Sequence, residues 1–526
     1  MTKLSQKQQT FVKICIITLT FGLLAHAYRF FNASFSHDSL FIFQPVNSED
    51  QISYGRFLIP IYVALRSTIC SPSLIGFISL LWLSVAIFII SDILNIKSTP
   101  ALICICGILS TNIAITASFA TYIPWVDIYM LALVFSVVAV YVFYKYKYGF
   151  LFAALPLLIS MGLYPVYFSA AVVMFLILLI KKIFEKEKTS AVIISGLKML
   201  CSLMLGLVLY YIAVRIAWHL TGVAPSEDYN GVAGAGNFSD IPSLLSLLIN
   251  TYVYPFKILR WQPICNSRYV ALLNIVILTI TAYNVIKIIL CQKLNFKNIL
   301  LLIVVMLLLP LGMNIAMFIA KGYVHHLMIY SFFLTYVLVV FTFEFIHQNN
   351  LSLQSLSSPA ALKRIMPSPE SKLVKSNLGG KIVFVAIALL IFNNIVFANQ
   401  TYLKKDLEFT ATASVMTRCL DRIEQTEGYI PGETPVAFIG DINKSALIET
   451  KPGYLHNMTG LYSSYSITFF DTYELYFTNV LGYNINCIPK SVYSDIEGLD
   501  EVVAMPSFPD KDSVKIINGI LVVKLS

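Results

Sequence analysis

The sequence ICIITLTFGLLAHAYRFF, residues 14–31, is an apolar run that follows Lys3, Lys7 and Lys13. As a helix it is long enough to cross the ~30 Å hydrocarbon core of a bilayer. The lysines before it predict a cytoplasmic N-terminus. Since the run has no small-residue cleavage site, we expect it to be an uncleaved membrane anchor.

The rest of the chain has the same character. Of its 526 residues, 57% are hydrophobic and 12% are charged, whereas soluble domains have about 25% charged residues. Apolar runs of roughly 20 residues recur, rather than the ~10-residue alternating segments of a β-barrel. We therefore expect a polytopic α-helical membrane protein with about eleven spans. They lie near residues 14–31, 74–94, 101–119, 127–144, 149–163, 166–179, 191–213, 271–290, 299–318, 327–345 and 382–397.

The formal net charge of +9 is unevenly divided. Residues 399–526 contain 10 Lys and Arg against 16 Asp and Glu, a net charge of −6, which leaves +15 for residues 1–398. Most of the basic residues lie in short loops that alternate with the spans, as the positive-inside rule expects. Because they form no basic recognition helix, nucleic acid is excluded as a partner.

Residues 55–71 are apolar, but we expect them to lie on the outer membrane surface. The run is short, is interrupted by Pro60 and is flanked by Arg56 and Arg66, which is typical of an interfacial segment. A span here would reverse every later loop and put the basic cluster 181–188 outside. We therefore assign residues 1–398 to a transmembrane body whose first outer loop is 32–72.

Residues 399–526 predict a small α/β domain outside the membrane. Residues 411–425 have an apolar stripe at helical spacing, and 435–439 are a strand. Asn518-Gly519 separates two further strands and predicts a hairpin with a type I′ turn.

The nine cysteines show no metal-ligand spacing. Cys104-Ile-Cys106 lies within a span, where cysteine behaves as a small hydrophobic residue. Cys419 and Cys487 fall in the predicted outer domain, where a disulfide can form. A buried free thiol at Cys419 is the alternative.

The first outer loop contains the sharpest candidate for catalysis, in the stretch Ser36-His37-Asp38-Ser39-Leu40-Phe41. Asp38 is a candidate general base, which needs a carboxylate held near an acceptor hydroxyl. The alternative is a helix cap. Glu49 and Asp50 either share the catalytic role or cap the following helix. His37 is expected to be a hydrogen-bond partner.

The outward basic residues are mostly arginine, six of eight, while Arg364 is the one arginine among the inward ones. The planar arginine fork binds phosphate or carboxylate through two hydrogen bonds, so we expect at least one of them to bind a phosphate. Snorkelling at helix ends is the alternative. The candidate substrate-binding residues are His37, Arg56, Arg66, Asp127, Arg215, Arg260, His325 and His326. For Asp127 the alternative is a helix cap, and the two possibilities weigh evenly. For His325 and His326 the alternative is a position at the membrane interface without contact to a substrate.

Several short motifs follow one another in a characteristic order. They are His37-Asp38-Ser39-Leu40, Tyr54-Gly55-Arg56-Phe57-Leu58, Tyr122-Ile-Pro-Trp-Val-Asp127-Ile-Tyr129, Met416-Thr-Arg418, Thr434-Pro-Val-Ala-Phe-Ile-Gly440, Met505-Pro-Ser-Phe-Pro509 and Val522-Val-Lys-Leu-Ser526. Over nearly its whole length the chain resembles the O-antigen glucosyltransferases of serotype-converting phages and enteric bacteria, in the GT-C class. No motif is strong alone, and the order carries the resemblance.

The resemblance implies an enzyme of the bacterial inner membrane with its C-terminal domain in the periplasm. It implies undecaprenyl-phosphate-glucose as donor, lipid-linked O-antigen as acceptor, and cooperation with a flippase and a donor-synthesising glucosyltransferase. The family's acidic base maps onto Asp38. Many GT-C enzymes have an acidic pair there, and His37 breaks that pair unless Glu49-Asp50 supplies the second acid. No cofactor is implied, and a divalent metal is not supported.

Two alternatives stay open. One is a flippase or transporter for lipid-linked sugars, which needs no base; such proteins often contain inverted repeats, and no repeat is evident here. The other is a glycosyltransferase that uses another polyprenyl-phosphate sugar.

Overall fold

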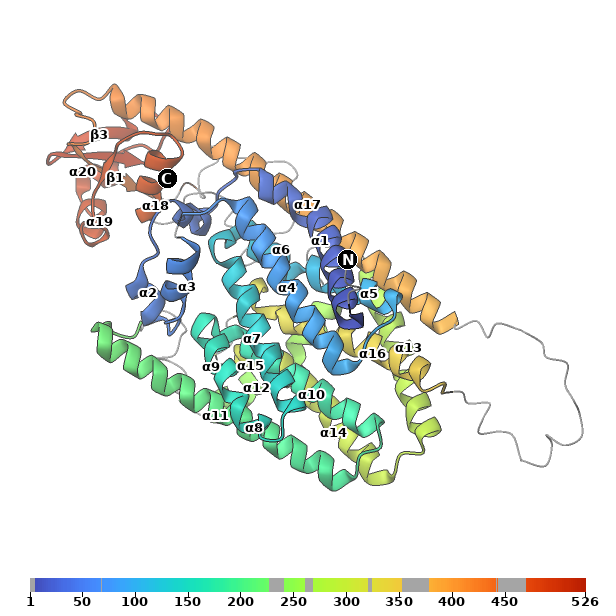
Figure 1. Ribbon diagram of the computed structural model, residues 1–526. Coiled ribbons are helices and arrows are strands. Elements are labelled where there is room, and N and C mark those ends of the chain that lie inside the picture. Colours follow the sequence, from blue (N-terminus) through green and yellow to red (C-terminus); the bar gives the residue numbers. More distant parts are fainter. Residues whose placement is uncertain are drawn as a thin grey trace, which may run out of the picture.

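The structure is a bundle of helices with a small β-sheet domain at one end (Figure 1). It is a computed structural model that describes residues 5–67, 69–226, 241–260, 268–319, 324–351, 378–440, 442 and 470–526.

The described helices of the bundle are α1 (Gln6–Phe31), η1 (His37–Phe43), α2 (Ser48–Ser53), α3 (Ile59–Arg66), α4 (Pro72–Leu94), α5 (Thr99–Thr111), α6 (Ile113–Thr121), η2 (Ile123–Trp125), α7 (Val126–Lys145), α8 (Gly149–Phe152), α9 (Ala154–Leu163), η3 (Pro165–Tyr167), α10 (Phe168–Phe184), α11 (Thr189–Thr221), α12 (Ile241–Arg260), α13 (Arg268–Gln292), α14 (Phe296–Met313), α15 (Ile315–Ile319), η4 (His326–Leu334), α16 (Thr335–Gln348) and α17 (Leu378–Glu424). The C-terminal elements are β1 (Pro435–Ile439), α18 (Phe470–Asn479), β2 (Asn486–Cys487), α19 (Lys490–Glu497), α20 (Asp500–Ala504), η8 (Lys511–Ser513), β3 (Val514–Ile517) and β4 (Ile520–Lys524).

The described residues include 10 helical segments that are long and apolar enough to cross a membrane. The predicted fold class, a polytopic α-helical membrane protein, is confirmed. The eleventh expected span, Gly149–Leu163, is a shorter apolar helix. It consists of α8 and α9, with Ala153 between them.

The span Thr99–Thr121 is the most enclosed, with 94% of its apolar window buried. Asn112 divides it into α5 and α6, and its side chain accepts hydrogen bonds from the N–H groups of Ala114 and Ile115. Broken backbone inside a bilayer must satisfy its polar groups within the protein. The interruption is tolerated because Asn112 caps α6 in the middle of the bundle.

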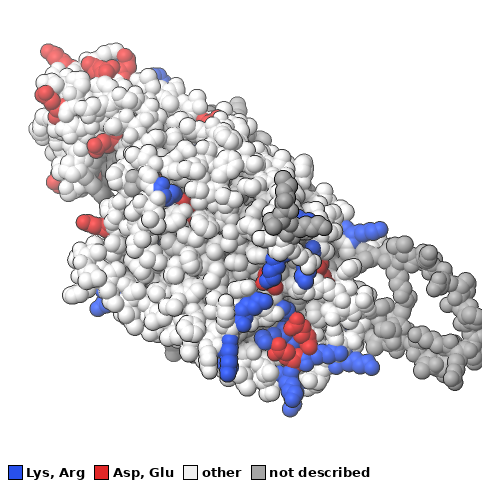
Figure 2. Space-filling model, in the orientation of Figure 1, with Lys and Arg blue, Asp and Glu red and all other residues white. Residues whose placement is uncertain are grey.

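Charged residues are separated along the molecule (Figure 2). Acidic side chains gather on the C-terminal domain, and basic side chains, with some acidic ones among them, gather toward the opposite end, with a broad and largely uncharged surface between them. The bundle helices have many exposed apolar side chains, such as Leu197 at 62% and Leu272 at 60%. Exposed apolar side chains on helices of this length are stable against lipid.

The short run at 55–71 contains the helix α3, which is too short to cross a bilayer. Its outward residues Ile61 and Leu65 are 59% and 85% exposed, while Ile59 and Val63 are buried. Such a two-sided helix fits the expected interfacial placement.

A single helix joins the bundle to the C-terminal domain. α17 has 47 residues and passes without a break through the predicted boundary between residues 398 and 399. It lies beside α1 along the bundle and continues to the sheet (Figure 1). The two predicted domains therefore share one helix.

The C-terminal sheet has the strand order β2-β1-β4-β3. β1 pairs in parallel with β2 and β4, and β3 pairs antiparallel with β4. The predicted strand 435–439 and the hairpin are confirmed. Ile517 pairs with Ile520, and Asn518 and Gly519 have φ values of 50° and 78°. Positive φ at both positions is what a type I′ turn requires.

Cys419 and Cys487 are both free thiols in the structure. Cys419 is 0% exposed in the core of the C-terminal domain, and Cys487 packs against the same core. Burial raises the pKa of the Cys487 thiol to about 12. Since the thiolate is the reactive form, both cysteines are expected to be unreactive in the folded protein.

We predict that unfolding without reductant makes both thiols available to iodoacetamide. Intact-mass analysis after alkylation is expected to give the same mass with and without prior reduction. A species that gains alkyl groups at Cys419 and Cys487 only after reduction would show a disulfide instead.

Candidate active site

The loop after α1 is folded into a short 3-10 helix, η1, by two serines. Ser36 N–H donates to the Ser39 hydroxyl at 2.6 Å, and the Ser39 hydroxyl donates to the Ser36 carbonyl at 3.0 Å. The Ser36 hydroxyl also donates to the Thr121 carbonyl at the end of α6, at 3.4 Å. These bonds hold the start of η1, and hence Asp38, against the end of a central span.

The other side of η1 is anchored in the C-terminal domain. Leu40 is 0% exposed and belongs to the same hydrophobic core as Met416, Phe438 and Phe477. Phe35 packs edge-on against Phe409 of α17, with ring centroids 5.9 Å apart. The loop is therefore clamped between the bundle and the sheet domain.

Asp38 is in the first turn of η1, beside His37. The Oδ2 atom of Asp38 is 3.2 Å from the Nε2 atom of His37, and their side chains are 29% and 11% exposed. Asp38 is thus partly open to solvent while its neighbour is mostly enclosed. A general base needs this combination of access and fixed geometry.

His325 comes to the same place from a distant part of the sequence. It precedes η4, and its ring lies edge-on to Tyr122, with centroids 6.4 Å apart. Burial lowers the pKa of His325, while the charge of Asp38 opposes that shift. His326, which starts η4, is 9% exposed.

Arg56 lies between α2 and α3 and faces aromatic rings. Its guanidinium carbon is 4.9 Å from the ring centroid of Tyr164 and 5.6 Å from that of Tyr54. The charges of Arg56, His37 and His326 all act on His325. Five of the predicted site residues, His37, Asp38, Arg56, His325 and His326, are thus neighbours although they are far apart in sequence.

Arg66 and Asp127 were predicted as separate substrate-binding residues, and the structure pairs them with each other. Arg66 Nη1 donates to Asp127 Oδ1 at 2.6 Å and to the Pro124 carbonyl at 3.0 Å. Tyr62 donates to the other carboxylate oxygen at 3.0 Å. The Asp127 side chain is 0% exposed. This arrangement ties α3 to the start of α7 and favours a structural role.

The remaining candidates lie elsewhere. Glu49 and Asp50 are exposed in the first turn of α2, where Asn47 is the cap and accepts from both of their N–H groups. Carboxylates in a first turn are stabilised by the helix dipole. Arg215 is exposed on α11, and no described contact connects it to Asp38. Arg260 ends α12, and its side chain is outside the described residues.

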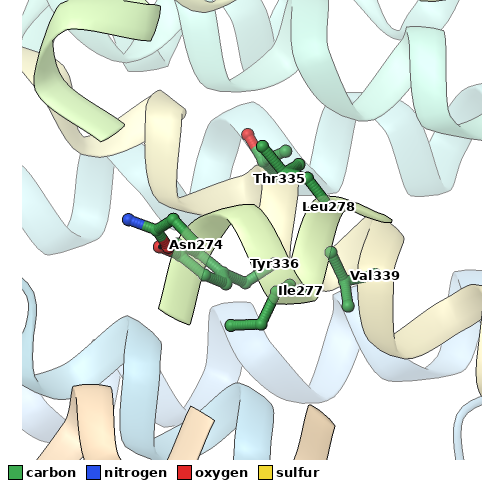
Figure 3. A pocket seen from close by; sticks show the side chains of 6 residues that line it. All are labelled: Asn274, Ile277, Leu278, Thr335, Tyr336 and Val339. Carbon is green, nitrogen blue, oxygen red and sulfur yellow. Dashed lines mark hydrogen bonds between the residues drawn. The ribbon is translucent and has the colours of Figure 1, made fainter. Parts of the chain in front are cut away.

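Among the described residues, two small cavities lie inside the bundle, away from Asp38. Figure 3 shows one of about 10 Å³ between α13 and α16, where Tyr336 donates to Asn274 at 2.6 Å. It holds one water molecule at most. The other, of about 70 Å³, lies between α1, α5 and α17. Within the described residues, no group of three or more His, Cys, Asp or Glu side chains is arranged to hold a metal ion.

Residues 27–343 match the glucosyl transferase GtrII family. The chain belongs to this family. It is therefore a glycosyltransferase. No curated protein and no solved structure matches the chain.

The matched residues of this GtrII-family glucosyl transferase include the whole Asp38 neighbourhood and the Arg66–Asp127 pair. They end before α17 and the sheet domain. Leu40 therefore lies inside the matched region, while the residues that it packs with, such as Met416 and Phe438, lie outside it. Sequence reasoning missed this contact because an apolar residue in a loop gives no signal of a distant partner.

Two buried cations were not among the predicted site residues. They are Arg29 of α1 and Lys405 of α17. Arg29 is one of the six outward arginines, but it was not a predicted substrate-binding residue. Lys405 sits in the run Lys404-Lys405-Asp406, which is typical of a solvated helix face. Only the packing of α17 against α1 reveals that Lys405 is enclosed.

We predict that Asp127→Asn destabilises the protein rather than weakening substrate binding. It leaves the Arg66 guanidinium, whose side chain is 5% exposed, without its charge partner. Breaking one side of a buried ion pair costs about 3–5 kcal/mol. Thermal unfolding in detergent measures the loss, and the double variant Arg66→Met, Asp127→Leu is expected to recover most of it.

Arg215→Gln is the matched control, because an exposed arginine is expected to change stability by less than about 0.5 kcal/mol. An Asp127→Asn enzyme with normal stability and a raised KM would contradict the structural role.

Proposed function

We propose that this enzyme transfers glucose from undecaprenyl-phosphate-glucose to the O-antigen of lipopolysaccharide, at the periplasmic face of the bacterial inner membrane, and so converts the serotype. The observation that supports this most is the half-open carboxylate of Asp38. It lies among His37, His325 and Arg56, on a loop held by both the bundle and the C-terminal domain.

In the proposed reaction, Asp38 removes the proton from an acceptor hydroxyl. The hydroxyl oxygen forms a new bond to the anomeric carbon of glucose. The bond between that carbon and the donor phosphate oxygen breaks, and undecaprenyl phosphate leaves with the electron pair. A cation near the departing phosphate stabilises the charge that develops there.

His37 and His325 have supporting roles in this scheme. His37 Nε2 is within 3.2 Å of the Asp38 carboxylate and orients it. The lowered pKa of His325 keeps its ring mostly neutral at pH 7, so it can donate a hydrogen bond to a sugar hydroxyl without competing for the charge of Asp38.

The aromatic surroundings of Arg56 suit a sugar. Tyr164 stacks on Tyr129, with centroids 4.3 Å apart, beneath the Arg56 guanidinium. Both rings are buried, so they hold the Arg56 guanidinium in place, and a guanidinium held in this way can donate hydrogen bonds to a sugar. We assign the Arg56 region to the sugar-binding part of the site.

A flippase for lipid-linked sugars is the alternative function. Transporter sites lie near the bilayer midplane and need no base. The Asp38 cluster, which consists of His37, Asp38, Arg56, His325 and His326, is at the end of the bundle, next to the C-terminal domain. This position favours transfer over transport. The donor then has to come from a separate glucosyltransferase and flippase, which are the expected partners.

We predict that Asp38→Asn abolishes glucosyl transfer while the protein still accumulates in the membrane. Asn keeps the shape of the side chain but cannot accept a proton. Loss of a general base reduces the rate by at least about 10²-fold. Appearance of glucose on the O-antigen, followed by composition analysis in cells with and without the gene, is the measurement.

Glu49→Gln and Asp50→Asn are the parallel variants and are expected to be active, because both carboxylates are exposed at the start of α2. A fully active Asp38→Asn enzyme would move the base to one of these residues. Transfer of a sugar other than glucose would leave the mechanism intact and change the donor.

The distribution of charge predicts that both the Asp38 cluster and the C-terminal domain lie on the periplasmic side. Lys145, Lys147 and the cluster 181–188 mark the opposite side as cytoplasmic. A reporter enzyme that is active only in the periplasm, fused after Ser526, is expected to be active. Activity of a cytoplasm-specific reporter at the same position would reverse the orientation.

A further inference from the structure

Two buried cations lie together behind the Asp38 loop. Arg29, near the end of α1, is 1% exposed, and Lys405 of α17 is 5% exposed. The charges of Glu408, Arg29 and Asp38 all act on Lys405, that of Glu408 most strongly. Like charges repel, and removing a cation from water is costly unless it is paired. The pair therefore requires an explanation.

Arg29 is held rigidly and keeps one edge open. Its Nε atom donates to the Phe119 carbonyl at 3.0 Å, and Nη1 donates to the Asn32 carbonyl at 3.1 Å. Nη2 is buried and has no hydrogen-bond partner among the described residues. These two hydrogen bonds fix the guanidinium plane, while the donors of Nη2 are not used within the described residues.

Lys405 is in the same situation. Its Nζ atom is buried and has no hydrogen-bond partner among the described residues. Glu408, three residues further along α17 and 3% exposed, is 3.7 Å from Lys404, and its charge also acts on Lys405 without a hydrogen bond to Nζ. A buried ammonium without a partner loses the free energy of its hydration, so an anion supplied from outside would be bound strongly.

An apolar cavity lies deeper between the same helices. It has a volume of about 70 Å³ and is lined by Phe21 of α1, Ile103 and Cys104 of α5, and Phe384, Ala388 and Ile391 of α17. Phe21 is eight residues before Arg29 on one helix, which corresponds to ~12 Å along its axis. On α17 the nearest lining residue is Ile391, 14 residues before Lys405 or ~21 Å along that axis, so the cavity lies deeper in the bundle than the two cations.

We propose that Arg29 and Lys405 form the subsite for the phosphate of a polyprenyl phosphate, whose chain enters the membrane along α1 and α17. The proposal deepens the proposed function, on which it rests, by assigning the residues that hold the departing phosphate. Arg29 Nη2 and Lys405 Nζ donate to phosphate oxygens. The proximity of Asp38 to Lys405 places base and leaving group in one region.

The subsite gives a role to two buried donors that have no acceptor among the described residues. Asp406 and Glu408 balance part of the charge of Arg29 and Lys405, and phosphate oxygens would accept the hydrogen bonds of Nη2 and Nζ. A role in structure alone makes the opposite prediction for substitutions, because a cation that stabilises the fold cannot be removed without loss.

The test measures binding to the full-length protein in lipid nanodiscs. The probes are undecaprenyl phosphate, the uncharged alcohol undecaprenol and inorganic phosphate. The wild type is expected to bind the phosphate lipid more tightly than the alcohol. In Lys405→Gln and Arg29→Gln this preference is expected to fall by at least about 10-fold, since a charge-assisted hydrogen bond contributes about 1.5–3 kcal/mol, while binding of undecaprenol stays unchanged.

Arg418→Gln is the matched control, since Arg418 is an exposed cation on the same helix. It is expected to bind all three probes as the wild type does. Thermal unfolding supplies a second readout. Without ligand, Lys405→Gln is expected to be at least as stable as the wild type, and undecaprenyl phosphate is expected to stabilise the wild type but not the variant.

Full retention of the phosphate preference in Lys405→Gln and Arg29→Gln would overturn the proposal, as would a marked loss of stability of Lys405→Gln in the absence of ligand. Displacement of the lipid by an equal concentration of inorganic phosphate would also contradict the assignment to a lipid. Failure of the proposed function is separate: a protein that binds undecaprenyl phosphate through Lys405 but transfers no glucose keeps the subsite and loses the activity.

Discussion

The insertion of Leu40 into the core of the C-terminal domain is the contact on which the candidate site depends. Asp38 sits two residues earlier, on a 3-10 helix that is only 7 residues long. Such a short helix has little stability of its own, and hydrogen bonding at Ser36 fixes only its first turn. Burial of Leu40 fixes the remainder, so the sheet domain determines the position of a carboxylate that belongs to the membrane body.

Features that depend on local sequence were predictable. Asn518-Gly519 specified its turn because few other residue pairs adopt positive φ at both positions. The spans were recognisable from length and hydropathy, and the eleventh, 149–163, is a shorter apolar helix than the others. Asp38 and the four residues around it were each predictable from their chemical type, and the fold brings them together.

What the sequence did not reveal depends on which groups pair with each other. Arg66 and Asp127 each looked available to a substrate, and their separation of 61 positions hid the ion pair between them. Lys405 looked solvated, and only the contact between α17 and α1 encloses it. The sequence shows that an ionisable residue can bind an opposite charge. Whether that charge belongs to the protein or to a ligand depends on which groups the fold places beside the residue.

The continuity of α17 sets the geometry of the whole molecule. A straight helix of 47 residues is ~70 Å long, more than twice the ~30 Å thickness of the hydrocarbon core. A continuous helix, and not a flexible linker, therefore connects the sheet domain to the bundle and fixes its distance and its rotation about the helix axis. Each residue inserted into α17 would move the domain by ~1.5 Å along the axis and turn it by ~100°. The length of α17 thus determines the distance between the membrane and the C-terminal domain that contacts the Asp38 loop.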